Sequence, residues 1–559
     1  MRFVAPAGDD GRLEVCAGLA NGVLQRAAVD AATGQLSDAR ARFLGSRAVR
    51  LFRCPVGGAP GLLALSSRAW LGYRPNGGGD ARLELAPLSY EALEYGAGFS
   101  SAQCPEGIVA IAGASLRIFV AEKLGETFNQ SVVPLRYTPR KLCRLPGSSR
   151  LLIVEADQHA YNEAEKQALA AARRVAGGDD MDLGGDDGGG DDAIPKVILQ
   201  GPTPPADGKW ASCVRVVDGA TGASLELLEL GESEAALSCC AVTFAGRGGE
   251  VFVAIGTARG LTFHPRAHRG CYVHVYRLLD ARLVLLHRTQ VEDAPLALAE
   301  FRGRLLVAVG GALRLYDLGK RRLLRKTEAQ IAPTLLVRLE VMGDRIFAAD
   351  ASSSVHYARY VREHNKIAVF ADDAVARCCT ACCALDYDTV AVADKFGNIA
   401  ILRLPADASD DVTDPTGSRL LWDAGAGAET KLQQLAHYHV GDVVTQLRKA
   451  TLVAGGAEGV VYVTVSGAVG ALVPSASRED KDFFAHLEMH MRQELVPPTG
   501  RDHVSYRSYY LPVKDVADGD ICGEFAALPF EAQKRIASDL DRTPGEVAKK
   551  LEDTRNRLL

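Results

Sequence analysis

A short β unit that recurs along the chain constrains its fold more than any other feature. The unit is an apolar run, a turn of Gly, Asp or Ser, and a second apolar run. Its clearest copy spans residues 389–394 and 398–404, joined by a Lys-Phe-Gly turn. Copies start near residues 251, 305, 345, 389 and 460, about 54, 40, 44 and 71 residues apart. Hairpins with a period of roughly 40–50 residues are typical of a β-propeller, with one repeat per four-stranded blade.

The same unit starts near residues 13, 62 and 108, so the repeats form two arrays. Three blades do not close a ring, because propellers usually have four to eight. We therefore expect residues 1–130 to be the C-terminal blades of an incomplete propeller, unstable alone or completed by another polypeptide. Residues 131–474 are predicted to form a complete ring of roughly seven blades. Because a blade cannot bury both its faces alone, such a chain is an all-β binding platform.

An insertion at about 163–207 interrupts the first blade of the second array. A helix-like run covers residues 163–175, and the segment 177–194 then carries seven acids, no base and little apolar content. Such a segment cannot bury enough surface to order itself. Its aspartate spacing partly resembles a calcium loop, but the required bidentate glutamate and alternating ligands are absent. We predict a disordered acidic loop there.

From residue 475 onward the pattern changes to helices. Residues 477–491 combine a cap-like start with apolar residues at helical spacing, and further helices are expected over 520–528 and from residue 529. The last helix has Thr543 as its N-cap and Pro544 at its first position. We expect residues 475–559 to form a small α-helical domain. The apolar face of the last helix is interpreted as packed, with docking to a partner as the alternative.

Composition and charge exclude several classes of protein. At 559 residues the chain fits two to four domains. Thirteen scattered cysteines, an odd number, favour a reducing compartment. We expect no membrane segment, since no apolar run approaches roughly 18 residues, and no signal peptide at the N-terminus. The insertion holds ten acids against four bases, so the remaining chain, at about +1, lacks a broad electrostatic surface for phosphate backbones.

Two motifs have the spacing of metal ligands, and both fall short. Cys379 and Cys382 form a C-x-x-C pair, but a zinc site usually needs two such pairs, so core packing is favoured. His486 and His490 lie one helical turn apart, but the glutamate that should follow the first histidine comes one residue late. The chain also contains no phosphate-binding loop and no nucleophile elbow. We expect no catalytic residue, metal, cofactor or small-molecule substrate.

A basic cluster, Lys-Arg-Arg-Leu-Leu-Arg-Lys at 320–326, follows a predicted strand. Such a cluster can contact phosphates or serve as a nuclear import signal. The favoured interpretation is a solvated hairpin edge whose charges oppose aggregation.

Long motifs carry a resemblance to a known family. They lie at residues 44–47, 103–111, 137–141, 316–320, 393–399, 414–417, 438–441, 500–503, 506–510, 518–520, 540–544 and 549–553. In these motifs the chain resembles the C-terminal half of the large propeller subunit of splicing factor 3b (subunit 3), a component of the U2 small nuclear ribonucleoprotein. Because the rest of that family's pattern is absent, we expect either a truncated gene product or one half of a split protein.

The resemblance implies a fold of β-propellers with a C-terminal helical domain. It also implies a non-enzymatic nuclear scaffold for branch-site recognition in pre-mRNA splicing, with the HEAT-repeat subunit and the small subunits of splicing factor 3b as partners. Association with U2 snRNA and pre-mRNA would be indirect. Two related architectures supply the alternatives: the DNA-damage-binding adaptor of cullin ubiquitin ligases and the large cleavage-and-polyadenylation subunit. The run at 541–553 favours the splicing family, because a propeller fold alone hosts many functions.

One segment between the ring and the helices is a candidate for partner binding. It is a loop rich in Tyr and Arg, and these residue types dominate interface hot spots. The alternative is that the same residues attach the helical domain to the propeller. The candidate residues are Arg501, His503, Tyr506, Arg507, Tyr509 and Tyr510.

Overall fold

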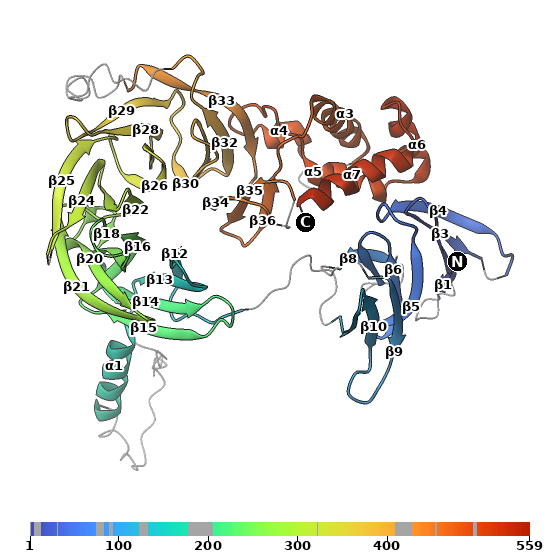
Figure 1. Cartoon of the computed structure of the whole chain (residues 1–559), viewed down its shortest axis with the longest axis horizontal. Coiled ribbons are helices and arrows are strands. Elements are labelled where there is room, and N and C mark those ends of the chain that lie inside the picture. The colour runs from blue at the N-terminus through green and yellow to red at the C-terminus, as the bar shows by residue number, and fades with distance from the viewer. Residues whose placement is uncertain are drawn as a thin grey trace, which may run out of the picture.

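A computed structural model describes most of the chain. The described residues are 2–4, 13–30, 32–73, 83–88, 93–121, 132–176, 205–320, 322–408, 427–452, 456–495 and 500–558. The predicted disordered loop at 177–194 lies outside them. Within the described residues the strands far outnumber the helices, and the helices gather mainly near the C-terminus (Figure 1). The predicted all-β propeller fold with a small C-terminal helical part is confirmed.

The N-terminal stretch forms three antiparallel sheets, which agrees with the three predicted units. The first sheet contains β1 (Arg2–Val4), β2 (Leu13–Gly18), β3 (Val23–Val29) and β4 (Leu36–Phe43). The second contains β5 (Arg50–Val56), β6 (Ala59–Leu65), β7 (Ala69–Tyr73) and β8 (Glu84–Pro87). The third contains β9 (Tyr95–Phe99), β10 (Gly107–Ala112) and β11 (Ser115–Phe119).

The second array begins with three four-stranded sheets. The first contains β12 (Pro139–Arg144), β13 (Arg150–Gln158), β14 (Trp210–Asp218) and β15 (Ser224–Leu230). The next contains β16 (Glu234–Thr243), β17 (Val251–Arg259), β20 (Gly270–Leu279) and β21 (Arg282–Val291), with the short ladder of β18 (Thr262–Phe263) and β19 (Arg266–Ala267) beside it. The third contains β22 (Ala297–Phe301), β23 (Arg304–Val309), β24 (Ala312–Leu318) and β25 (Leu323–Gln330).

Two further four-stranded groups and a final sheet complete the array. A short parallel pairing of β29 with β33 joins the two groups into one eight-stranded sheet. The groups are β26 (Leu336–Met342), β27 (Arg345–Asp350), β28 (Ser354–Val361) and β29 (Lys366–Asp373), then β30 (Cys379–Ala384), β31 (Thr389–Asp394), β32 (Asn398–Arg403) and β33 (Thr430–His439). The final sheet contains β34 (Val444–Ala450), β35 (Gly459–Thr464) and β36 (Val469–Leu472).

These sheets follow one another around a nearly closed ring (Figure 1). The first strand of each blade contacts the first strand of the next, so the first strands line the inside of the ring. Middle strands such as β23 and β27 are buried along nearly their whole length, because each is covered by a neighbouring blade on either side. Outer strands such as β25 are exposed or half-buried beyond their first residue. This difference explains why the middle strands were the clearest signal in the sequence.

The number of blades differs from the prediction. We expect roughly seven blades in residues 131–474, whereas the described residues of this stretch form six. The interval of about 71 residues between the starts at 389 and 460 suggests room for an extra blade. In the described residues this interval contains the connection from β32 to the long strand β33 and no additional sheet. The domain boundaries at 130 and 474 stay predictions.

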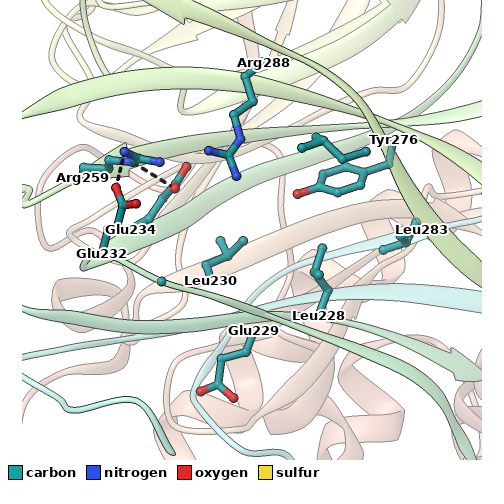
Figure 2. A pocket seen from close by; sticks show the side chains of 11 residues that line it. Leu228, Glu229, Leu230, Glu232, Glu234, Arg259, Tyr276, Leu283 and Arg288 are labelled. Atoms are coloured by element: carbon teal, nitrogen blue, oxygen red, sulfur yellow. Dashed lines mark hydrogen bonds and ion pairs between the residues drawn. The ribbon is translucent and has the colours of Figure 1, made fainter. Parts of the chain in front are cut away.

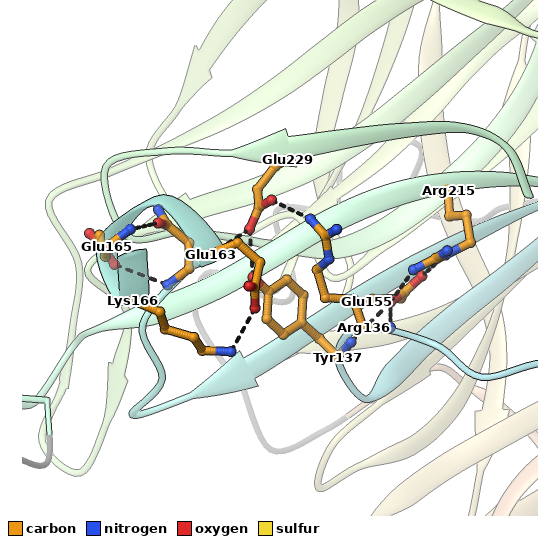
Figure 3. Close-up of polar contacts among 9 residues, drawn as sticks. Arg136, Tyr137, Glu155, Glu163, Glu165, Lys166, Arg215 and Glu229 are labelled. Carbon is orange, nitrogen blue, oxygen red and sulfur yellow. Dashed lines mark hydrogen bonds and ion pairs between the residues drawn. The ribbon is translucent and has the colours of Figure 1, made fainter. Parts of the chain in front are cut away.

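A helix and a polar cluster occupy one face of the first blade. Helix α1 (Glu163–Ala176) agrees with the run predicted at 163–175. Glu229 of β15 accepts hydrogen bonds from the Arg136 guanidinium (2.6 Å), the Tyr137 hydroxyl (2.5 Å) and the backbone N–H of Glu163 (3.2 Å) (Figure 3). These bonds fix the start of the helix against the blade.

The C-terminal helices pack around one apolar cluster that includes Phe483, Leu487 and Val547. The helices packed around it are α3 (Arg478–Glu494), α5 (Gly519–Gly523), a short 3-10 helix (Glu524–Ala527), α6 (Phe530–Asp539) and α7 (Pro544–Leu558). Helix α4 (His503–Arg507) contributes no residue to the cluster and contacts β33. The predicted start of α7 is confirmed: Thr543 and Glu546 exchange side-chain to backbone hydrogen bonds. Helix α7 also contacts β4, and Figure 1 shows it beside the N-terminal sheets.

Candidate partner interface

The candidate segment joins the ring to the helices, and part of it is helical. The sequence predicts a loop, but residues 503–507 form α4, with Asp502 as its N-cap accepting a hydrogen bond from the Ser505 N–H (3.1 Å). A helix of five residues is too short to show a 3.6-residue apolar period, so the pattern could not reveal it. The helix lies against β33 and carries three of the six candidate side chains, His503, Tyr506 and Arg507.

Asp518 is the centre of a buried polar network under α4. Its carboxylate, 4% exposed, accepts hydrogen bonds from His503 Nε2 (2.8 Å) and from Arg507 Nε (2.9 Å). The same side chain caps α5 through the Asp520 N–H (3.0 Å). Burial alone would raise the pKa of Asp518, but the hydrogen bond from His503 and the charge of Arg507 outweigh it and lower this pKa to about 2. The carboxylate is therefore ionised whenever the protein is folded near neutral pH.

Arg507 and Tyr506 attach α4 to the ring. The Arg507 guanidinium donates to the carbonyl oxygens of His439 and Val440, both at 3.1 Å. The Tyr506 hydroxyl lies so close to Gly441 that a Cβ at this glycine would be 1.9 Å from it. Because Gly441 also has a φ of +97°, only glycine fits there without strain. His503, Tyr506 and Arg507 therefore face the ring and the helices, not the solvent.

Three other side chains form an exposed surface, which we call the aromatic patch. It consists of Phe396, Tyr509 and Tyr510, which are 42%, 53% and 48% exposed. The ring centroids of Phe396 and Tyr510 are 4.8 Å apart, and those of Tyr509 and Tyr510 are 5.0 Å apart. Two exposed cations flank the patch: Lys395 lies over Phe396 at 5.1 Å, and Arg501 lies over Tyr509 at 5.6 Å. Tyr, Phe and Arg are the residue types enriched at protein interfaces.

The structure brings all six candidate residues together but divides them into two sets. His503, Tyr506 and Arg507 make mainly internal contacts. Arg501, Tyr509 and Tyr510 are exposed, and the Tyr509 ring also stacks on His439, with 5.5 Å between the ring centroids. The sequence reasoning missed the partners that organise them: Phe396, His439, Gly441, Glu488 and Asp518. Four of these five lie in the motifs at 393–399, 438–441 and 518–520. Their place in the family motifs was the signal in the sequence that could have found these residues. The sequence did not show that the motifs meet at one site, because segments distant in the chain come together only on folding.

The described residues contain no group of three or more His, Cys, Asp or Glu side chains arranged to hold a metal ion. Cys379, Cys382 and Cys383 are buried within apolar clusters, as the core-packing interpretation predicts. In the basic cluster, Lys326 pairs with Asp317 and Arg325 pairs with Glu328. Among the described helices, none is long and apolar enough to span a bilayer.

Comparison with protein families identifies the chain. A family model described as the CPSF A subunit region matches residues 211–527, more than half of the chain. The chain belongs to the CPSF A subunit family. A second model, described as the second β-propeller of RSE1, DDB1 and CPSF1, matches residues 3–121. In this CPSF A family member, the first match runs from β14 through the short 3-10 helix, and the second covers the three N-terminal sheets.

Individual relatives agree with the predicted resemblance. Spliceosome-associated protein 130 A of Arabidopsis thaliana is 48% identical over 99% of this chain and 47% of the relative. Splicing factor 3B subunit 3 of Danio rerio is 47% identical over 98% of this chain and 46% of the relative. Pre-mRNA-splicing factor RSE1 of Mycosarcoma maydis is 44% identical over 96% of this chain and 44% of the relative. The chain therefore spans about half the length of the curated relatives that it matches, and its resemblance to splicing factor 3b subunit 3 is confirmed.

Proposed function

We propose that this chain is a non-enzymatic scaffold subunit of splicing factor 3b that supports branch-site recognition in pre-mRNA splicing. The observation that carries the proposal is similarity along nearly the whole chain to relatives named for splicing or the spliceosome. The fold agrees with a scaffold role, because a ring of blades presents a large rigid surface. Names linked to ubiquitin ligation or polyadenylation do not occur among these relatives, so the alternative functions are not favoured.

The proposal includes partners and a compartment. The partners are the HEAT-repeat subunit and the small subunits of splicing factor 3b, and the compartment is the nucleus. Association with U2 snRNA and pre-mRNA then follows through those subunits, in keeping with a body that is nearly neutral outside the insertion. We also propose a division into blades at 1–130, a ring at 131–474 and a helical domain at 475–559, in keeping with the order of sheets and helices.

Within this scaffold we propose that the aromatic patch is a partner-binding surface. Three adjacent half-exposed aromatic rings with two flanking cations supply rigid contact area at a low entropic cost. The inward set, built on Asp518, holds the patch in place. Arg501, Tyr509 and Tyr510 are therefore the binding residues, and His503, Tyr506 and Arg507 are positioning residues.

A capture experiment with two double variants tests this assignment. Tyr509→Ala with Tyr510→Ala removes the patch and should weaken retention of the tagged HEAT-repeat subunit about tenfold or more while leaving the melting temperature nearly unchanged. His503→Ala with Arg507→Ala should lower the melting temperature by several degrees because the buried Asp518 carboxylate loses its donors. Undiminished capture by the tyrosine variant, or its collapse to a lower melting temperature, would contradict the assignment.

A further inference from the structure

A small cavity opens on the outer wall of the ring between the first two blades. It lies where the connection from β15 to β16 meets β20 and β21, and its volume is about 190 Å³ (Figure 2). Leu230, Tyr276 and Leu283 form its buried apolar lining, and Leu285 stands half-exposed beside them. Typical small-molecule sites measure about 300–1,000 Å³. This cavity therefore has room for one inserted side chain and not for a cofactor.

The three glutamates that line the cavity already have partners. Glu229 pairs with Arg136 at 2.6 Å, as described above. Arg259 pairs with both Glu232 and Glu234, the latter at 3.1 Å. Each carboxylate thus has a cationic partner in the same blade or in the next one, and Arg259 is shared by Glu232 and Glu234.

One cation at the cavity differs from the rest. Arg288 is exposed, and its guanidinium has no hydrogen bond or ion pair with the described residues. In Figure 2 its guanidinium lies between the Glu234–Arg259 pair and the Tyr276 ring, directed toward the cavity. A guanidinium offers a rigid fork of donors that matches a carboxylate. The geometry points to an anionic group as its missing partner.

Hydrogen bonds hold the walls of the cavity in place. Glu234, 3% exposed, accepts hydrogen bonds from Thr257 Oγ1 (2.5 Å) and His274 Nε2 (2.8 Å). The preceding residues Glu232 and Ser233 have φ values of +57° and +55°, a conformation that side-chain-bearing residues rarely adopt. Both are the central residues of a tight turn, which the hydrogen bond from the Glu234 N–H to the Gly231 carbonyl oxygen (3.0 Å) closes. A cavity held open in this way needs little rearrangement to bind.

The strand beside the cavity is exposed and apolar. Val284, Leu285 and Leu286 follow one another on β21 and are 49%, 43% and 39% exposed. Strand β21 is also the last strand of its sheet, so one of its edges has no neighbouring strand within that sheet. An exposed edge with apolar side chains is a common site for an extended peptide.

We propose that this cavity and β21 bind an extended segment of a partner protein that inserts a leucine-sized side chain beside an aspartate or glutamate. The apolar side chain occupies the space over Tyr276 and Leu283, and the acidic group pairs with Arg288. A nucleic acid fits less well, because Arg288 is the one cation among the described lining residues without an ion pair, whereas a phosphate backbone needs several cations. The inference goes beyond the proposed scaffold role and does not depend on it, since peptide binding can be measured without any splicing factor.

Two matched peptides test the proposal on the full chain. The probe is a fluorescein-labelled ten-residue peptide with a central leucine between two aspartates in a Ser-Gly background, and its match carries lysines in place of the aspartates. We expect the acidic peptide to bind by fluorescence anisotropy and the basic peptide to bind at least tenfold more weakly. Arg288→Glu should weaken the acidic peptide about tenfold or more, and Leu285→Asp should do the same.

Arg282→Glu on the same strand is the matched control, because Arg282 is exposed and does not line the cavity. It should leave the affinity unchanged, and all three variants should keep the wild-type melting temperature. The proposal is overturned if neither peptide binds up to about 1 mM. It is equally overturned if the basic peptide binds as well, or if Arg288→Glu and Arg282→Glu have the same effect.

Discussion

At the scale of single residues, Asp518 shows how a buried charge organises the junction between ring and helices. Burial opposes its ionisation, but His503 and Arg507 supply hydrogen bonds and charge that more than offset this cost. Removing one member of such a network leaves the others desolvated and unpaired, which is more damaging than the absence of the whole network. Asp518 is therefore expected to influence stability more than its exposed neighbours.

Asp518→Asn should destabilise the protein by about 3 kcal/mol at pH 7, because Arg507 keeps its charge but loses its counter-ion. Urea unfolding at pH 7 measures the loss, and Asp520→Asn, an exposed neighbour, is the control with little expected effect. Equal stability of the Asp518→Asn and Asp520→Asn variants would show that the network is not stabilising.

The difference in stability between the wild type and Asp518→Asn should depend on pH with a definite sign. The folded pKa of Asp518, about 2, lies below its ordinary value of 3.8, so the wild-type advantage is complete above pH 3.8 and is lost as the pH falls toward 2. We expect the difference in the free energy of unfolding between wild type and Asp518→Asn to be constant from pH 7 to 5 and to become smaller near pH 3. A gap that widens on acidification would contradict this assignment.

A second residue-scale prediction concerns a thiol on the inner side of the ring. A hydrogen bond from Cys239 outweighs burial and lowers the pKa of Cys143 to about 7. Since the thiolate is the nucleophile, alkylation of Cys143 by iodoacetamide should reach half its limiting rate near pH 7. Cys239→Ala should move this midpoint upward, and Cys240→Ala should not. Peptide mass spectrometry across pH 6–10 gives the rates, and a wild-type midpoint near the ordinary value of about 8.5 would exclude the interaction.

At the scale of elements, the fit between α4 and the end of β33 depends on Gly441. Gly441→Ala would place a methyl group 1.9 Å from the Tyr506 hydroxyl, in addition to straining the backbone. Gly467 has a similar φ of +90° but nothing within 4 Å of an added Cβ. Gly467→Ala therefore measures the cost of the backbone strain without a steric clash.

We therefore expect Gly441→Ala to lower the stability by at least about 2 kcal/mol more than Gly467→Ala, because overpacking adds to the strain. Tyr506→Phe should recover part of the difference by removing the hydroxyl. Thermal unfolding of the three variants measures these effects. If the two alanine variants lose the same stability, the contact with Tyr506 does not matter.

The elements also show what could be predicted from the sequence. Middle strands such as β23 and β31 are buried on both faces, so they appear as continuous apolar runs, and the capping pattern of Thr543 located α7. Helix α4 was missed because five residues carry no helical period. The candidate residues could be chosen by type, but their division into inward and outward sets depends on Asp518 and Gly441. Gly441 is distant in sequence from α4, and Asp518 is distant in sequence from β33. Only the three-dimensional contacts supply that information.

At the scale of the whole molecule, α7 connects the two ends of the chain. Arg42 of β4 pairs with Glu552 of α7 at 3.1 Å, and Lys549 lies over the Phe43 ring at 5.3 Å. Two charged side chains of α7 therefore contact β4 directly. These contacts support the interpretation of α7 as a packed helix. It also joins the N-terminal sheets to the proposed scaffold.

Arg42→Glu should make the N-terminal sheets more sensitive to limited proteolysis, because two carboxylates would then face each other. A partly exposed pair of this kind contributes about 1 kcal/mol, so the effect should be modest. Adding Glu552→Arg restores opposite charges and should return the proteolysis rate toward that of the wild type. A double variant as sensitive as the single one would indicate that the pair does not hold the sheets.

The scaffold proposal is tested most directly by identifying what the chain binds. The tagged chain would be purified from nuclear extract after nuclease treatment, and the retained proteins would be identified by mass spectrometry. We predict recovery of the HEAT-repeat subunit and the small subunits of splicing factor 3b, resistant to nuclease and reduced by Tyr509→Ala with Tyr510→Ala. Recovery of a cullin or of polyadenylation factors in their place, or of no splicing factor subunit, would contradict the proposal.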